Sequence, residues 1–502
     1  MPRIPVTMAT QHPDNASAPY WEKDGDSYVS TREEVQECYS AFADLGCEEF
    51  MWDWEGKYVD EAVAEKLFSK YFSYFKKHRL GEDKFLIYRI PNIWAEGEHS
   101  LPRAFMTILT FRELALSLGF KKPPVFEVIL PMTDSAEKII HIQKQFRKFA
   151  RAVAGVFKND HGVFDYLRMR PLIEGTDELT APGKILTAYA IMHKKEFGPL
   201  EYLRADIARS DPALNSGLVP AVISAKIALS EYYRFEKNTG IKIYPAIGAG
   251  SLPFRGGLSP DRLDDFMEEY AGTKTVYVQS GFRYDFPLPK VKQAIAKLNK
   301  YLPKTKPALY DKKVIETGRE LNGIFCSYYR KTVESLADDI NNFARHIPAR
   351  RERRLHIGLF GYSRSVGKKK LPRAIPFTAA LYSLGVPPEF IATGRGIKEA
   401  LRRGLLPQLE KIYLHIQDEL RFAGRFYNSE NMDRLAKQDA RWAEIKKDVS
   451  IVEDYLGEKL GPKTTAELIC RNFTSSIYLL MRSGKNPAAE IIEAAKIRKS
   501  LG

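Results

Sequence analysis

Segment 355–377 begins with an apolar run, and five cationic side chains follow that run within a stretch of ten residues. The run breaks at Gly361, and the cations are Arg364, Lys368, Lys369, Lys370 and Arg373. Glycine lets the backbone approach a ligand closely, and the planar guanidinium group of arginine matches paired oxygens of a phosphate or carboxylate. The three lysines alone are typical of a solvated loop, but the two arginines lie beside apolar residues, where a charge needs a partner. The segment therefore predicts an anion-binding site.

A second candidate lies near the start of the chain, where residues 10–15 read TQHPDN. This stretch is too polar and too constrained by proline for a helix interior, so we expect a loop. A lone histidine is most often structural or merely exposed, whereas the polar neighbours of His12 can orient its ring for proton transfer. The residues leave both roles open.

The elements that must position these residues repeat along the chain as a short β-prone run, a polar break and a longer helical stretch. The predicted strands are 49–54, 85–90, 125–130, 166–173, 202–207, 243–247, 275–278 and 355–360. Helical stretches such as 135–156, 218–238 and 260–271 separate them. Eight strands alternating with helices favour parallel pairing and predict an α/β fold, specifically a (β/α)₈ barrel of the TIM type.

Catalytic residues of such barrels collect at the C-terminal ends of the strands. The polar residues that follow the predicted strands are Asp53, Glu55, Arg89, Asn92, Thr133, Asp134, Glu174, Asp211, Arg255, Gln279, Ser280 and segment 361–364. Each carboxylate alone is more typical of a salt bridge, but Glu174 and Asp211 follow consecutive strands and together suit Mg²⁺ or Mn²⁺. A metal beside several arginines indicates chemistry on a phosphorylated carboxylic acid or sugar.

The composition is that of an ordinary globular protein, with 44% hydrophobic and 28% charged residues in 502. This length allows two or three domains or one large barrel. The formal charge of +14 suggests nucleic acid or a small polyanionic substrate as the partner. The basic residues are interspersed with acidic ones and no nucleic-acid module is recognisable, which favours the substrate.

The cysteines and the apolar segments indicate the compartment. Four widely separated cysteines suggest neither a disulfide framework nor a zinc site. The N-terminus lacks the apolar core of a signal peptide, and no run approaches the roughly 18 apolar residues of a membrane span. We therefore expect a cytoplasmic protein without a membrane partner.

The chain after Phe377 is almost wholly helical, with apolar residues at three- and four-residue spacing in 408–422, 433–456 and 465–481. No linker rich in Gly, Ser or Pro precedes this region. We expect a single catalytic domain over 1–502, made of an N-terminal loop and helix (1–46), the barrel (47–377) and a helical C-terminal region (378–502) packed on the barrel.

The motifs together resemble the phosphoenolpyruvate carboxylase family, specifically its short archaeal type, whose TQHPDN signature stands at 10–15. The TAHPTE motif of the longer bacterial and plant relatives implies His12 as the catalytic histidine. Their PLFET and GYSDSGKDAG segments are similar to 171–176 and 209–217, which implies that Glu174 and Asp211 bind the metal. Their IGSRP, LRAIPW and RIDIRQ segments imply that Arg364, Arg373 and Arg89 bind substrate.

The chain departs from the longer relatives in three places. Their HGRGGSVGRGG loop is AIGAGSLPFRGG here, so the second arginine corresponds to Arg255, followed by Gly256 and Gly257, and the first corresponds to Ala249. Their loop lysine corresponds to a position near Leu214. Their C-terminal MRNTG is similar to 481–484, after which this chain continues for eighteen residues. Because Ala249 stands in place of the first loop arginine, one anion contact is missing or supplied from elsewhere.

The resemblance implies irreversible carboxylation of phosphoenolpyruvate by bicarbonate. Bicarbonate attacks the phosphorus to give carboxyphosphate and an enolate that Mg²⁺ or Mn²⁺ stabilises. His12 assists breakdown to CO₂ and phosphate, and the enolate captures the CO₂ to give oxaloacetate. Arg255, Arg364 and Arg373 hold the phosphoryl group, while the loop with Gly256 and Gly257 excludes water.

The family also implies a cytoplasmic homotetramer with an anaplerotic role in carbon dioxide fixation. Two other functions stay open at this point. One is another Mg²⁺-dependent barrel enzyme acting on phosphoenolpyruvate or a 2-oxoacid, such as a mutase or lyase. The other is a basic RNA-binding protein, which predicts steeply salt-dependent RNA affinity.

Overall fold

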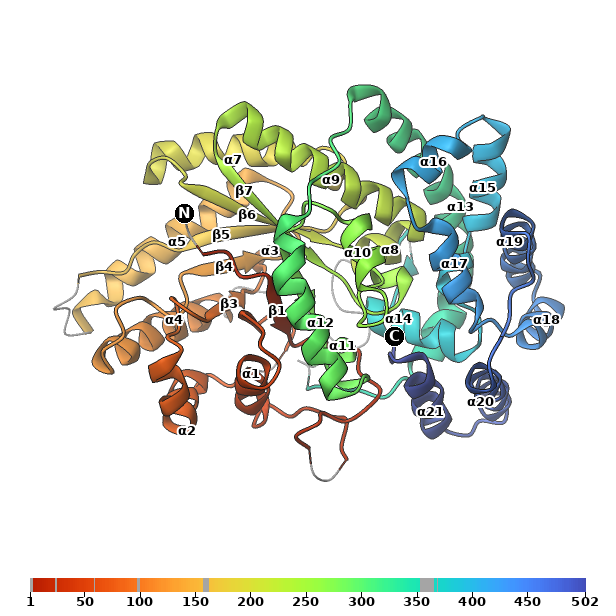
Figure 1. Cartoon of the computed structure of the whole chain (residues 1–502), viewed down its shortest axis with the longest axis horizontal. Helices are drawn as coiled ribbons and strands as arrows, with labels where there is room; N and C mark the ends of the chain where they lie inside the picture. The colour runs from red at the N-terminus through yellow and green to blue at the C-terminus, as the bar shows by residue number, and fades with distance from the viewer. Residues whose placement is uncertain are drawn as a thin grey trace.

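The computed structural model describes residues 3–22, 25–57, 59–96, 100–156, 162–352, 365–367 and 369–502. The predicted strand 355–360, Gly361, Arg364 and Lys368 lie outside the described residues. Figure 1 shows a strand barrel surrounded by helices, with a helical region on one side of it.

Eight parallel strands form a closed barrel in chain order, which confirms the predicted fold class. They are β1 (Thr7–Thr10), β2 (Glu49–Asp53), β3 (Phe85–Arg89), β4 (Glu127–Leu130), β5 (Arg168–Ile173), β6 (Tyr202–Ala208), β7 (Lys242–Gly248) and β8 (Thr275–Val278). β1 pairs with both β2 and β8, so it closes the barrel.

β1 was not among the strands predicted from the sequence. The first seven predicted strands correspond to β2–β8, whereas the true first strand is only the four residues TMAT and runs directly into the polar loop. Two threonines in four residues give almost no apolar signal, although all four side chains are buried. The barrel therefore begins before residue 47, and the opening segment is not merely a loop and a helix.

The barrel interior is filled rather than open. One apolar layer consists of Met8, Met51, Ile87, Ile129, Leu172, Ala208, Ala246 and Tyr277. Beside it lies a buried ion network in which Arg170 pairs with Asp206 and Glu49, and Arg204 pairs with Glu49 and Glu127. Buried guanidinium groups are tolerated because each has carboxylate partners. Because side chains fill this interior, a site formed by the barrel itself must lie at one of its ends.

Helices cover the outside of the barrel and connect its strands (Figure 1). They are α1 (Glu34–Ala43), α2 (Val63–Lys77), α3 (Ile93–Glu96), α4 (Ser100–Ser117), α5 (Ala136–Val153), α6 (Thr176–Leu179), α7 (Pro182–Phe197), α8 (Ser210–Ser216), α9 (Leu218–Thr239), α10 (Leu263–Glu269), α11 (Ser280–Tyr284) and α12 (Leu288–Tyr301). Short 3₁₀ segments are η1 (Ala154–Val156), η2 (Pro253–Arg255), η3 (Leu302–Lys304) and η4 (Pro388–Phe390).

The remaining chain is mostly helical and packs against the barrel. It comprises α13 (Lys312–Ala344), the hairpin β9 (Ser365–Val366) and β10 (Lys369–Lys370), α14 (Ala374–Ser383), α15 (Thr393–Arg402), α16 (Leu406–Ile412), α17 (Ile416–Gly424), α18 (Ser429–Gln438), α19 (Ala440–Leu456), α20 (Thr465–Arg482) and α21 (Ala488–Arg498).

Two predicted helices in this region are each divided in the structure. The stretch 408–422 is α16 and α17, and 433–456 is α18 and α19. Asp439 separates the second pair in an extended conformation, and its side chain accepts a hydrogen bond from the Arg441 amide to cap α19. Among the described residues, no helix is both long and apolar enough to cross a bilayer.

Candidate active site

A small cavity of about 60 Å³ lies at the C-terminal end of the barrel. Its lining comes from the segments after β1, β2, β6 and β7, from the last residues of β2 and β3, and from the start of α14 with the residue before it: His12, Pro13, Asp53, Lys57, Arg89, Ser210, Asp211, Arg255, Arg373, Ala374, Ile375 and Pro376. Parallel strands deliver their following loops to one barrel end, which is why residues far apart in the sequence meet here. The structure thus brings His12, Arg89, Asp211, Arg255 and Arg373 together.

His12 follows β1, and its Nδ1 lies 2.9 Å from the hydroxyl oxygen of Thr10. Burial lowers the pKa of the imidazole well below its ordinary value, and the nearby charges of Arg89 and Lys57 lower it further. The ring is therefore neutral at neutral pH. A neutral imidazole has an unprotonated ring nitrogen that can accept a proton from a substrate, and the ring then carries a positive charge.

Arg89 and Lys57 are both anchored on Asp53 at the end of β2. The Arg89 Nε and Nη2 donate to the two carboxylate oxygens at 2.8 and 2.7 Å, and Nη1 lies 2.9 Å from Glu55 Oε2. Lys57 Nζ donates to Asp53 and, at 2.7 Å, to the Gln11 carbonyl. Burial opposes ionisation of Asp53, yet Arg89 and Lys57 hold its pKa well below the usual range. The cations are thereby fixed in position.

Lys57 was not among the site residues predicted from the sequence. It follows Glu55 and Gly56 after the first predicted strand, so its position offered a weak signal. Its side chain is only 2% exposed, and it lines the cavity with His12. Leu214, near which the longer relatives carry a loop lysine, is fully buried and apolar. The lysine that lines this cavity is Lys57, which follows β2.

Arg255 lies in η2 after β7 and is held on several sides. Its Nη1 donates to Asp14 Oδ2 at 2.9 Å and to the Gly502 carbonyl, while Nη2 donates to Gln279 Oε1 at 2.6 Å. Asp14 and Gly502 lie far from Arg255 in the sequence. Asp14 was predicted only as a neighbour that orients His12, and Gly502 was not predicted to contribute.

The backbone around Arg255 requires glycine at the next position. Gly256 has φ of 122°, and a Cβ there would lie 2.6 Å from the Cβ of Ala249. Ala249 is itself only 1% exposed. The turn therefore packs closely against Ala249, and a side chain at 256 would collide with it. Gly257 likewise has a positive φ, of 75°.

Glu174 and Asp211 line a second cavity of about 210 Å³, which adjoins the first because Asp211 belongs to both. Its other lining residues are Met132, Thr133, Asp134, Gly175, Glu178 and Asn215. Within the described part of the chain, no group of three or more His, Cys, Asp or Glu side chains is arranged to hold a metal. Two carboxylates on an open cavity nevertheless fit a hard cation that retains several waters.

Arg373 is the residue before α14 and is 8% exposed at the first cavity. Arg364, its predicted partner in phosphate binding, lies outside the described residues. The segment 481–484, compared above with the C-terminus of the longer relatives, ends α20 at an exposed position. It is residues 500–502 that reach the site, where the Leu501 amide donates to the Asp14 carbonyl at 2.8 Å.

Comparison with known proteins identifies the family. The family model described as phosphoenolpyruvate carboxylase matches residues 4–502. The chain belongs to the phosphoenolpyruvate carboxylase family. Proteins of that name are similar to it in Leuconostoc mesenteroides (39% identity, 93% of this chain and 92% of the relative) and Metallosphaera sedula (40%, 99% of both). A third, from Methanothermobacter thermautotrophicus, is 38% identical over 100% of both chains.

These relatives make the chain an enzyme of the phosphoenolpyruvate carboxylase type, a carboxy-lyase, and they include archaeal members. A solved structure titled "Haloferax volcanii Malate Synthase Pyruvate/Acetyl-CoA Ternary Complex" aligns with 82% of this chain and 96% of that chain. Its identity of 12% and TM-score of 0.38 are too low to bear on this protein.

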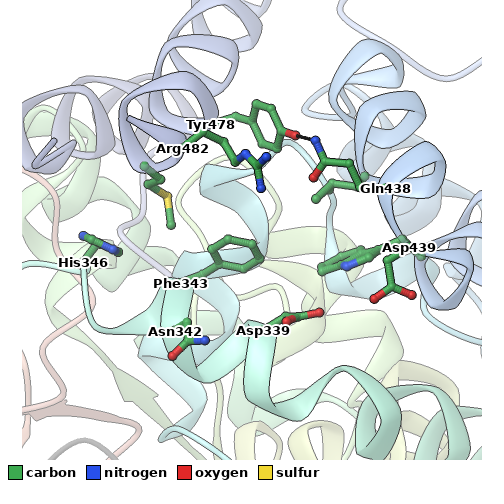
Figure 2. Close-up of a pocket in the computed structure, with 11 residues that line it drawn as sticks. Asp339, Asn342, Phe343, His346, Gln438, Asp439, Tyr478 and Arg482 are labelled. Carbon is green, nitrogen blue, oxygen red and sulfur yellow. Dashed lines mark hydrogen bonds between the residues drawn. The ribbon is translucent and has the colours of Figure 1, made fainter. Parts of the chain in front are cut away.

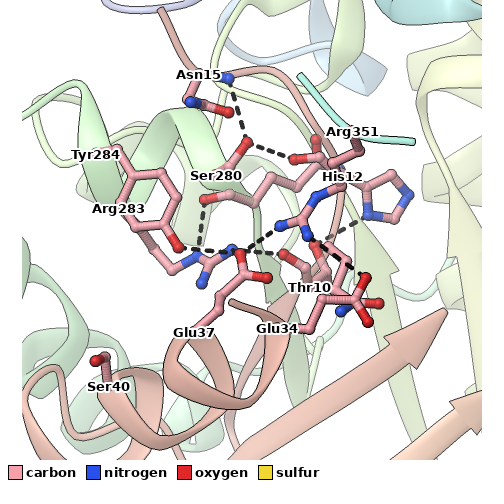
Figure 3. A network of polar contacts seen from close by, with 12 residues as sticks. Thr10, His12, Asn15, Glu34, Glu37, Ser40, Ser280, Arg283, Tyr284 and Arg351 are labelled. Carbon is pink, nitrogen blue, oxygen red and sulfur yellow. Dashed lines mark hydrogen bonds and ion pairs between the residues drawn. The ribbon is translucent and has the colours of Figure 1, made fainter. Parts of the chain in front are cut away.

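In this carboxylase, a buried ion network fastens the end of β1, two residues before His12 (Figure 3). Arg283 Nη2 donates to the Thr10 carbonyl at 2.6 Å and to Glu37 Oε1 at 2.8 Å. The same Glu37 oxygen accepts from Arg351 and, at 3.0 Å, from the Tyr284 hydroxyl. Since the Thr10 hydroxyl contacts the His12 ring, this network positions the histidine.

The network also contains a carboxyl group that keeps its proton. Burial raises the pKa of Glu34 to about 8, and Glu37 adds to the effect against the opposing charge of Arg351. The unfolded chain releases this proton near its ordinary pKa of about 4.3. The folded state therefore binds more protons across this window, and its stability falls as pH rises through it.

We expect Glu34→Gln to remove this fall in stability. At about pH 8 the variant should be more stable than the parent by on the order of a few kcal/mol, since one pKa unit corresponds to about 1.4 kcal/mol. Near pH 4 the parent and the variant should have similar free energies of unfolding. Denaturant titrations across this range would measure it, and equal pH slopes for both proteins would contradict the protonated state of Glu34.

Proposed function

We propose that this enzyme joins phosphoenolpyruvate and bicarbonate to give oxaloacetate and phosphate by way of carboxyphosphate and an enolate. The observation that carries the proposal is the neutral His12 ring in one cavity with Arg89, Arg255 and Arg373. Cations there favour an anionic substrate, and a neutral base beside them favours proton transfer during its breakdown.

The arginines have different parts in this proposal. Arg373 precedes α14 at the cavity wall, where its guanidinium group can meet the phosphoryl oxygens. Arg255 is tied to Asp14 and Gln279, so it presents a fixed charge without needing to reorganise during the reaction. Arg364 is proposed as a further phosphate ligand by the resemblance alone. Gly256 and Gly257 let the backbone approach the substrate.

His12 acts on carboxyphosphate. Its neutral imidazole accepts the carboxyl proton, the bond from carbon to the bridging oxygen breaks with its electron pair going to phosphate, and CO₂ is released. The enolate carbon then bonds to CO₂. Because the surrounding side chains are buried, little water competes to protonate the enolate to pyruvate.

Glu174 and Asp211 are proposed to hold Mg²⁺ or Mn²⁺. Such a cation supplies Lewis-acid stabilisation of negative charge that develops on a substrate oxygen. The carboxylates line the cavity that adjoins His12 through Asp211, so this assignment places the cation beside the substrate.

The family match favours a carboxylase over the mutase or lyase considered above, and over an RNA-binding protein. We further propose, on the family resemblance, a homotetrameric, cytoplasmic enzyme with an anaplerotic role and one catalytic domain over the whole chain.

The proposal is tested by measuring oxaloacetate and phosphate from phosphoenolpyruvate with and without bicarbonate, and with and without Mg²⁺ after chelation. We expect both products only when bicarbonate and the metal are present, in equal amounts. Phosphate release that does not require bicarbonate would overturn the carboxylation chemistry. Oxaloacetate formation unaffected by chelation would overturn the metal assignment.

A further inference from the structure

The C-terminal helices enclose a cavity of about 350 Å³ that shares no residue with the active-site cavities. Its lining comes from α13 and the residues just after it, from α18, α19 and α20, and from Asp439 between α18 and α19: Asp339, Asn342, Phe343, His346, Leu435, Gln438, Asp439, Trp442, Tyr478, Met481 and Arg482. The volume lies within the roughly 300–1,000 Å³ range of small-molecule sites. Figure 2 shows these side chains arranged around a common space.

One part of the lining is aromatic. The rings of Phe343 and Trp442 lie 6.2 Å apart at 55°, and the Trp442 side chain is almost fully buried at 2% exposure. Across the cavity the Tyr478 hydroxyl accepts a hydrogen bond from Gln438 Nε2 at 2.6 Å (Figure 2). Rigid aromatic faces bury a flat ring at little entropic cost, and the tyrosine is already fixed.

The charges of the lining are asymmetric. Asp339 and Asp439 both pair with Arg441, whose Nη2 lies 3.0 Å from the first and whose Nε donates at 2.7 Å to the second. Their negative charge is therefore partly compensated. Arg482 and His346, by contrast, make no ion pair with any residue that the structure describes. The Arg482 guanidinium group points toward Phe343 (Figure 2).

We propose that this cavity binds a small anion bearing a flat ring, with the ring against Phe343, which Trp442 supports from behind, and the anionic group on Arg482. Arginine pairs with phosphate and carboxylate alike, so the shared chemistry is a planar ring joined to one of these groups. The site is independent of the carboxylation chemistry, because its lining is separate from that of the active-site cavities.

Isothermal titration calorimetry with four probes tests whether binding requires both the planar ring and the anionic group. Adenosine 5′-monophosphate carries a ring and a phosphate, indole-3-acetate carries a ring and a carboxylate, adenosine has the ring alone, and inorganic phosphate has the charge alone. We expect saturable binding of at least one ring-bearing anion, and binding of adenosine and phosphate at least tenfold weaker. The first two probes distinguish a phosphate from a carboxylate ligand. Failure of both to bind would overturn the proposal.

Matched variants on α20 locate the binding. Both Arg482 and Arg471 are exposed on α20, but Arg482→Gln removes a cation that lines the cavity, whereas Arg471→Gln removes one outside the lining. The first should weaken binding of the ring-bearing anion roughly tenfold to a hundredfold, as expected for a hydrogen bond to a charged group. The second should leave it unchanged. Undiminished binding to Arg482→Gln would place the probe elsewhere, in the active site for example, and would overturn the assignment.

Discussion

Replacing His12 with asparagine is expected to lower the rate of oxaloacetate formation roughly 10²- to 10⁴-fold, the usual contribution of a general acid or base. Asparagine retains a polar group near the Thr10 hydroxyl but cannot take up a proton near neutral pH. The measurement is the initial rate of oxaloacetate formation, with phosphate release followed in parallel. Phosphate release that continues with pyruvate as the other product would place His12 after cleavage of phosphoenolpyruvate.

His141→Asn serves as the matched control, because His141 is exposed on α5 and is not part of either active-site cavity. It should leave both rates near those of the parent. A His12→Asn enzyme that makes oxaloacetate at the parent rate would remove the histidine from the mechanism, since its burial and its neutral ring would then serve structure alone.

Removing the charge of Glu37 is expected to destabilise the folded state by about 3–5 kcal/mol, the range for breaking a buried ion pair. Glu37→Gln leaves Arg283 and Arg351 buried with no carboxylate shared between them. Chemical denaturation would measure the loss. Glu430→Gln is the control: its partner Arg434 and its own side chain are partly exposed, and surface pairs contribute at most about 1 kcal/mol.

The pH dependence of folding stability gives a second test of the role of Glu37. Burial alone would raise its pKa, but Arg351 and Arg283 lower it to about 2. A carboxylate with a depressed pKa stabilises the fold above its ordinary pKa, and this contribution is lost as pH falls toward about 2. The parent should therefore lose this contribution in acid, and Glu37→Gln should not. Similar acid sensitivity in both proteins would contradict the network described here.

The barrel could be predicted because most of its strands are apolar runs that can be recognised from their own residues. β1 could not, since its burial comes from pairing with β2 and β8 rather than from its own composition. Local patterns alone placed Arg89 and Glu174 at strand ends. The role proposed for His12 needed the resemblance to a known family, because its sequence neighbours fit a structural histidine equally well.

The residues that pair with the side chains of the candidate site cannot be predicted from local sequence patterns. Arg255 meets Asp14 across 241 positions of sequence, and Arg283 meets Glu37 across 246. Charged residues are common on surfaces, and only the assembled fold decides which of them become buried pairs. The position of Lys57 could not be predicted for the same reason. Its partner Asp53 is close in sequence, but the cavity that Lys57 lines is also formed by residues at the ends of β1 and β3.

The contact between the Leu501 amide and the Asp14 carbonyl also bears on the order of events during synthesis. The barrel strands all precede residue 279, so on the ribosome they can pair long before α21 emerges. Arg255, however, takes one of its partners from Gly502. The nascent chain can therefore have a closed barrel while the candidate active site still lacks the contacts of Leu501 and Gly502, which form only after α21 has been made.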